Sequence, residues 1–302
     1  MDTVYKFCGA HGLTILRNLE LKITPPNQFN DPFEFTPKII YSDRVSYAKR
    51  ALDREDVHKW LYQLYLKSNF RGSFDEYQKK SIDILIQAPE HTSPLVEKEF
   101  LCEVGKRYGI LCLSKNRDSI LMWGHYCDKL LGIVIGFDKA SAIFKQGKGL
   151  RPVNYVGERV ILDACWEVGS PELLNYEEQI IHSKSLAWKY EGEFRQFFPL
   201  SSSSLVKKPL EDKEKHPDNL LRKCTQLFLK YLGFKNTAQS FGYFLPIPPE
   251  AIVSVTLGPR CSPDFENEVR GILQKPCFSH VEIFDRAVLH KNNFLIDFES
   301  VQ

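Results

Sequence analysis

Two glutamates and an arginine, Glu191, Glu193 and Arg195, are the residues whose types and spacing best suit chemistry. They alternate within residues 188–200, a stretch that predicts the end of a helix running into a strand. Because successive side chains of a strand point to opposite faces, we expect all three charges on one face. Two neighbouring carboxylates disfavour each other's ionisation, so one pKa would be raised, and Arg195 could offset the repulsion or meet a phosphate.

The other face of this strand carries Phe194 and Phe198, which we expect in the core. Charges on a strand face are costly to bury unless that face meets water or a ligand. Two interpretations are therefore open. The charged face is either a solvated surface with an ordinary Glu–Arg pair or the floor of a cleft.

The composition is typical of a soluble globular protein and excludes several classes. The 302 residues carry 40 Lys+Arg against 38 Asp+Glu, so neither a basic field for nucleic acid nor an acidic excess is present. The eight cysteines include no C-x-x-C pair, so no metal site is predicted. Without a signal-peptide pattern or an apolar run of roughly 18 residues, we expect a reduced cytoplasmic protein with no membrane contact.

Apolar spacing predicts an α+β fold in a single domain over residues 1–302. It includes a helical insertion at 43–107, most simply a cover beside the sheet, and a loop-plus-helix insertion at 201–235 with a helix opening at Pro217. The other expected helices are 13–19, 120–126, 139–145, 171–188 and 262–274. The expected strands are 4–7, 21–23, 109–114, 131–138, 150–156, 194–198, 241–247, 251–257 and 281–289.

Residues 25–34, Pro-Pro-Asn-Gln-Phe-Asn-Asp-Pro-Phe-Glu, predict a shaped loop because they are too rich in Pro, Asn and Asp for a helix or strand. Asn30 and Asp31 are candidates to hold backbone or ligand, with an Asx-type turn that binds nothing as the alternative. The glycines form neither a G-x-G-x-x-G turn nor a G-K-[ST] motif, so neither a Rossmann nor a P-loop site is predicted.

Four stretches resemble a bacterial family catalogued as domain of unknown function 2971, a resemblance that spans nearly the whole chain and implies no activity. They are Tyr5-Lys6-Phe7, the Asn-Asp-Pro-Phe-Glu loop, Cys112–Ser114 followed by Met122–Tyr126, and Tyr190–Arg195.

The layout is also similar, in order and spacing, to ADP-ribosyltransferases. That resemblance implies mixed, antiparallel-rich split sheets around a cleft and NAD as substrate, without a metal. Lys6 stands where that fold has His or Arg, and the Ser-Thr-Ser pattern of the fold is missing. The positions that the resemblance assigns to the site are Tyr5 or Lys6, Ser114, Tyr126, Glu191 and Glu193.

Under this resemblance, cleavage of the nicotinamide–ribose bond passes through an oxocarbenium-like state. Glu193 would offset the developing charge, and Glu191 would position or deprotonate the acceptor. Trp123 and Tyr126 could stack on nicotinamide, with core packing as the alternative for Trp123. Arg195 would meet a phosphate.

We also expect Asn30 and Asp31 to line the same cleft. The implied function is transfer of ADP-ribose from NAD to a protein or nucleic-acid acceptor, in bacterial defence, including phage defence, or in a toxin system. A hydrolase of NAD or N-glycosidic bonds and a non-catalytic interaction module are the alternatives.

Overall fold

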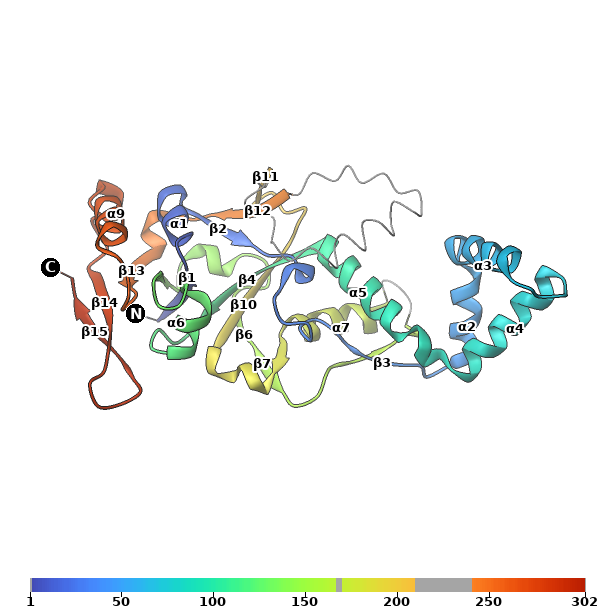
Figure 1. Cartoon of the computed structure of the whole chain (residues 1–302). Helices are drawn as coiled ribbons and strands as arrows, with labels where there is room; N and C mark the ends of the chain where they lie inside the picture. Colours follow the sequence, from blue (N-terminus) through green and yellow to red (C-terminus); the bar gives the residue numbers. More distant parts are fainter. Residues whose placement is uncertain (1, 167–169, 210–240, 302) are drawn as a thin grey trace. The chain divides into compact units, whose positions relative to one another are not determined.

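The computed structural model describes residues 2–166, 170–209 and 241–301, and these residues form a mixed α+β fold with a large, mostly antiparallel sheet (Figure 1). The chain divides into two compact units. Unit 1 comprises Met1–Pro25, Arg107–Pro152 and Tyr190–Gln302, and unit 2 comprises Pro26–Lys106 and Val153–Lys189. The helix expected from Pro217 lies outside the described residues, as does most of the 201–235 insertion. The single domain stays a prediction.

An eight-stranded sheet is the frame of unit 1, with the order β15-β14-β13-β5-β1-β4-β10-β6. Adjacent strands of this sheet are antiparallel, except for the parallel pair β13–β14. The strands are β1 (Thr3–Cys8), β4 (Tyr108–Ser114), β5 (Ile133–Asp138), β6 (Arg151–Pro152), β10 (Glu193–Pro199), β13 (Ile252–Leu257), β14 (Ile283–Leu289) and β15 (Ile296–Ser300).

A smaller antiparallel sheet and three α-helices complete the described part of unit 1. The sheet has the order β11 (Val206–Pro209), β12 (Phe241–Pro246) and β2 (Glu20–Ile23). The helices are α1 (Gly12–Asn18), α6 (Ile120–Tyr126) and α9 (Pro263–Leu273). The start of α9 follows the sequence closely: the Ser262 side chain accepts a hydrogen bond from Phe265 N, and Pro263 occupies the first turn.

The two faces of the large sheet carry different side chains. On β1, Val4 and Cys8 point into the main core, whereas Phe7 points to the opposite face, as strand alternation requires. There Phe7 meets Trp123 of α6 edge-on, with the ring centroids 5.6 Å apart. The contact between apolar side chains of β1 and α6 therefore holds α6 against this second face of the sheet.

The prediction that Phe194 and Phe198 enter the core is confirmed. Phe198 is 3% exposed within the main core, and the half-buried Phe194 packs against the same cluster. The ammonium of Lys139 lies over the Phe194 ring at 4.4 Å from its centroid, a cation–π contact at the half-buried side of this residue.

Unit 2 is built from helices and two short parallel strand pairs. The pairs are β3 (Lys38–Ile40) with β8 (Ile161–Asp163), and β7 (Asn154–Val156) with β9 (Ser183–Ser185). Its helices are α2 (Arg44–Asp53), α3 (Glu55–Lys67), α4 (Phe74–Gln87), α5 (Ser93–Arg107) and α7 (Pro171–Ile181), of which α2, α3 and α4 contact one another (Figure 1). Leu162, Tyr176 and Ile180 are the centre of its core.

Three predicted elements of this fold are wrong. Residues 139–145 form a turn and a 3₁₀-helix, Ala142–Lys145, because the Asp138 carboxylate accepts from Ala140 N and closes a turn instead of capping an α-helix. Residues 150–156 form two strands, β6 and β7, which lie in different units. The helix expected over 171–188 ends at Ile181, after which β9 pairs with β7. No helix in the described ranges is both long and apolar enough to cross a bilayer.

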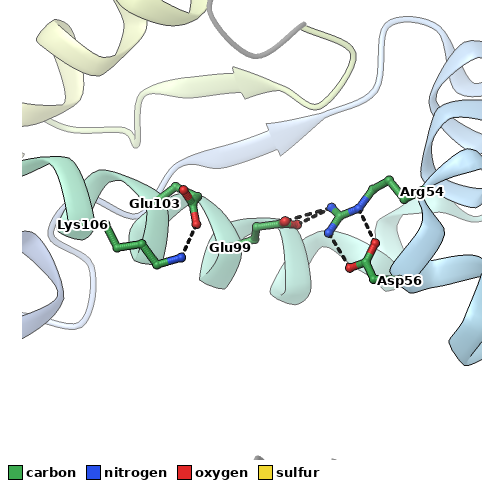
Figure 2. Close-up of polar contacts among 5 residues, drawn as sticks. All are labelled: Arg54, Asp56, Glu99, Glu103 and Lys106. Carbon is green, nitrogen blue, oxygen red and sulfur yellow. Dashed lines mark hydrogen bonds and ion pairs between the residues drawn. The ribbon is translucent and has the colours of Figure 1, made fainter. Parts of the chain in front are cut away.

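Arg54 joins the start of α3 to α5. Figure 2 shows its guanidinium between the carboxylates of Asp56 and Glu99, with nitrogen–oxygen distances of 2.8–3.1 Å. The hydrogen bonds that Arg54 donates, first to Asp56 and then to Glu99, raise the pKa of Arg54, and the bonds to Asp56 lower the pKa of that carboxyl group below its usual 3.8. All three side chains are largely exposed, so each pair is expected to stabilise the fold by only about 0.2–1 kcal/mol.

Replacement of Arg54 with alanine is therefore expected to lower the free energy of unfolding by about 1 kcal/mol, measured by urea denaturation. Because the pKa of Asp56 is lowered, the stability that its carboxylate contributes is complete above pH 3.8 and is lost as the pH falls below that value. The difference in the free energy of unfolding between the wild type and Arg54→Ala should therefore be equal at pH 7 and pH 5. It should shrink in 1 M salt. A loss that persists unchanged in high salt would contradict the ionic account. Lys79→Ala, at an exposed position on α4, is the control.

The described cysteines differ in burial, from the fully buried Cys8 to the exposed Cys102. Burial raises the pKa of Cys8 to about 12 against the opposing effect of Lys6, and it raises the pKa of Cys127 as well. Because the thiolate is the reactive form, iodoacetamide at pH 8 should modify the exposed Cys102 and Cys277 in the native protein and leave Cys8 and Cys127 unmodified. Mass spectrometry of tryptic peptides measures this; equal rates at Cys8 and Cys102 would show that the core opens.

Candidate functional site

Three predicted site residues lie in one row across three adjacent strands of unit 1. Tyr5 of β1 is directly opposite Ser114 of β4, and Ser114 is directly opposite Glu193 of β10. Residues that are opposite in register project to the same face of a sheet with their Cβ atoms about 4.5–5.5 Å apart. The register thus brings together side chains from positions 5, 114 and 193 of the chain.

Ser114 ties this row to the segment before β10. Its hydroxyl is 2.5 Å from the carbonyl oxygen of Glu191 and 3.0 Å from that of Asn116, and it accepts a hydrogen bond from Asn116 N. A hydroxyl has one proton, so it donates to one of the two carbonyls at a time. Ser114 is 2% exposed, and this bonding fixes the chain at Glu191 against the end of β4.

Glu191 lies in the same site, but not on the strand as predicted. It is the last residue of a 3₁₀-helix, η4 (Leu186–Glu191), and β10 begins only at Glu193. The alternation that relates Glu193 to Arg195 therefore does not extend to Glu191. Its side chain is nonetheless buried, and its Oε1 accepts a hydrogen bond of 2.7 Å from the hydroxyl of Tyr126 on α6.

Gly192 explains the break between the helix and the strand. Its φ of +52° lies in the left-handed region, which side chains other than that of glycine rarely adopt. A Cβ at this position would also lie 2.8 Å from Lys115 Cγ, while the Gly192 carbonyl accepts from Lys115 N. Because Gly192 separates the 3₁₀-helix from the strand, the side chains of Glu191 and Glu193 do not have to point to the same face, as residues two apart in one strand would.

Glu193 and Arg195 form a buried, bidentate ion pair. The Nε of Arg195 is 2.8 Å from Glu193 Oε1, and its second nitrogen is 3.0 Å from Oε2. The side chains are 5% and 0% exposed, which excludes the interpretation of a solvated outer face. Burying two charges costs several kcal/mol per ion before their attraction is counted, so this pair is a weak source of net stability.

Two other predicted site residues face elsewhere. Trp123 is completely buried, donates through Nε1 to the carbonyl of Arg117 at 2.8 Å and packs on Phe7, so core packing is its observed role. Lys6 is on the opposite face of β1 from Tyr5, and its ammonium donates to the carbonyl of Cys112 at 3.0 Å. Tyr5 rather than Lys6 therefore lies in the row with Ser114.

Asn30 and Asp31 belong to unit 2. The carboxylate of Asp31 accepts from Phe33 N at 2.9 Å, which is the Asx-type turn that the sequence allowed. Their expected place beside Glu193 stays a prediction. One residue of the site, Asn116, was not predicted from the sequence, and its backbone forms hydrogen bonds with Ser114. A polar residue just after a buried strand is the sequence feature that could have indicated it.

The site of unit 1 is thus a group of two buried carboxylates, a buried guanidinium and the three hydroxyls of Tyr5, Ser114 and Tyr126, near the end of β4 and the start of β10. Residues 122–196 match the model of a family described as "Protein of unknown function (DUF2971)". This match confirms the resemblance to that family over the stretch from α6 to β10, which contains Tyr126, Glu191 and Glu193. No curated protein and no solved structure matches the chain.

Proposed function

We propose that this chain consumes NAD as an ADP-ribosyltransferase-like enzyme, transferring ADP-ribose to a macromolecular acceptor. The observation that carries the proposal is the row of Tyr5, Ser114 and Glu193 across three adjacent strands, joined by Glu191 and Tyr126. The ADP-ribosyltransferase resemblance assigned these five positions to one site, and they come from four separate segments of the sequence. Bacterial defence or a toxin system is the setting that this proposal expects.

The proposed roles follow from the partners of each carboxylate. Glu193 stabilises the positive charge that develops on the ribose, and the bidentate contact with Arg195 orients its carboxylate. Glu191, held by the Tyr126 hydroxyl, deprotonates or orients the acceptor. Tyr5 supplies a hydroxyl group at the ribose side of the row, and Ser114 holds the chain at Glu191 in place through its own hydrogen bonds.

Burial sets a condition on this chemistry. Glu193 is 5% exposed, so NAD reaches the carboxylate only when neighbouring side chains move. Exclusion of water then benefits the reaction, because charges interact more strongly in a site of low dielectric constant. A site that opens to bind and closes to react is consistent with a group of this kind.

Incubation with labelled NAD, first alone and then with a bacterial lysate, tests the proposal against its alternatives. Label on protein or nucleic acid supports the transferase. Free ADP-ribose without macromolecular label supports a hydrolase on the same residues. Absence of NAD turnover under both conditions contradicts the proposal and leaves a structural ion pair in an interaction module.

A further inference from the structure

Unit 2 contains a cavity of its own that the proposed NAD chemistry does not use. Its volume is about 440 Å³, in the lower half of the range of roughly 300–1,000 Å³ that small-ligand pockets occupy. The loop Asp31–Thr36 forms one wall, and the others are residues 156–160 and 183–188. All of these segments belong to unit 2, and the first wall contains most of the Asn-Asp-Pro-Phe-Glu motif that the sequence singled out.

The cavity is formed where two parallel strands end. Strands β7 and β9 pair with Val156 opposite Ser185, and the chain leaves both strands in the same direction into the cavity walls. The carboxyl ends of parallel strands are a common place for ligands in α/β proteins. In the first wall, Phe35 has a φ of +60°, an uncommon conformation for a bulky residue, so the loop is held in a strained shape.

Three aromatic residues line this cavity, and two of them, Phe33 and Trp188, have a cation beside the ring. The guanidinium of Arg159 is 5.6 Å from the centroid of Phe33, whose side chain is 64% exposed. The ammonium of Lys184 is 5.1 Å from the centroid of Trp188. Flat rings stack on planar groups. The lining holds two cations, Arg159 and Lys184, beside three carboxylates, so the walls suit a planar ligand with one anionic end and with hydroxyl or amino groups elsewhere.

Lys184 also forms a buried ion pair with Glu34. Their charged atoms are 3.7 Å apart, and the side chains are only 6% and 1% exposed. A buried pair contributes little net stability, and charged groups that line a cavity are candidates for ligand contact. Asp31 lies on the same wall as Glu34, so carboxylates line the part of the cavity where hydroxyl or amino groups of a ligand would bind. The ammonium of Lys184 lies beside them, where it could contact an anionic group of the ligand.

We propose that this cavity binds a nucleoside monophosphate. The base stacks on Phe33 and Trp188, the phosphate lies at Arg159 and Lys184, and the carboxylate of Asp31 accepts hydrogen bonds from the ribose. A mononucleotide combines the planar, anionic and hydroxyl-bearing parts that these walls address, and the volume suits one nucleotide rather than a dinucleotide.

Isothermal titration of the full chain with AMP tests this site. We expect one AMP to bind per chain, adenosine to bind at least about tenfold more weakly, and inorganic phosphate alone not to compete. Phe33→Ala should weaken AMP binding about tenfold or more through loss of stacking; because Phe33 is exposed, this variant keeps the fold. Leu174→Ala, which removes another exposed apolar side chain, from α7, should bind as the wild type does.

A second variant separates the charge from the ring. Arg159→Met, at a side chain that is 43% exposed, should weaken AMP binding about tenfold and leave adenosine binding unchanged, whereas Lys98→Met on α5 should alter neither. Glu191→Gln in unit 1 should bind AMP normally, which distinguishes failure of this proposal from failure of the NAD proposal. Absence of AMP binding, AMP binding that Phe33→Ala does not weaken, or equal competition by phosphate would each overturn the inference.

Discussion

Replacement of Glu191 with glutamine is expected to lower ADP-ribose transfer to macromolecules by about a hundredfold or more, the scale of losing a general base. The melting temperature should stay nearly unchanged, because the glutamine oxygen can still accept the hydrogen bond from Tyr126 and the shape of the side chain is conserved. Hydrolysis of NAD should fall much less, since the proposed role of Glu191 is on the acceptor side. Both rates are measured with labelled NAD.

Two further variants serve as a control and as a test of how Glu191 is oriented. Glu299→Gln removes an exposed carboxylate from β15 and should change neither transfer nor hydrolysis. Tyr126→Phe removes the hydroxyl that orients Glu191, so it should reduce transfer less than Glu191→Gln does. Transfer by Glu191→Gln at the wild-type rate would remove this glutamate from the mechanism.

Breaking the pair of Glu193 and Arg195 is expected to have the largest effect on stability. Either Glu193→Gln or Arg195→Met leaves one buried charge without its bidentate partner, which should lower the free energy of unfolding by about 3–5 kcal/mol. Equilibrium urea denaturation measures the loss. Breaking an exposed ion pair, such as that of Arg54 with Asp56, should lower the free energy of unfolding far less, because water replaces the missing partner.

The double variant separates the structural role from the chemical one. Glu193→Gln combined with Arg195→Met removes both charges, so its loss of stability should be smaller than the sum of the two single losses. Additive losses would show that the two side chains do not depend on each other. NAD turnover should stay low in every variant that lacks the Glu193 carboxylate.

The row of site residues could be predicted in part because strands follow local rules. Phe194, Arg195 and Phe198 alternate as a strand requires, and the sequence was sufficient to place them on two faces. The same rule failed at Glu191, because the left-handed conformation of Gly192 ended a 3₁₀-helix just before the strand. Glycine in such a motif is the signal that alternation does not continue.

Other features depended on contacts between distant segments. Strand β9 is only three residues long and exists because it pairs with β7, so the helical pattern before it predicted a longer helix instead. The cavity of unit 2 likewise forms from three segments that no local pattern relates. Strand β15 was missed although Ile296, Asp297, Phe298 and Glu299 alternate apolar and acidic residues, a signal that its pairing with β14 now explains.

The most direct test of the proposed function is nicotinamide release from NAD by the wild type and by the Glu193→Gln, Arg195→Met double variant. The proposal predicts release by the wild type and by the Glu299→Gln control, with a fall of about a hundredfold or more in the double variant while it remains folded. A folded double variant that releases nicotinamide at the wild-type rate, or a wild type that releases none, would contradict it.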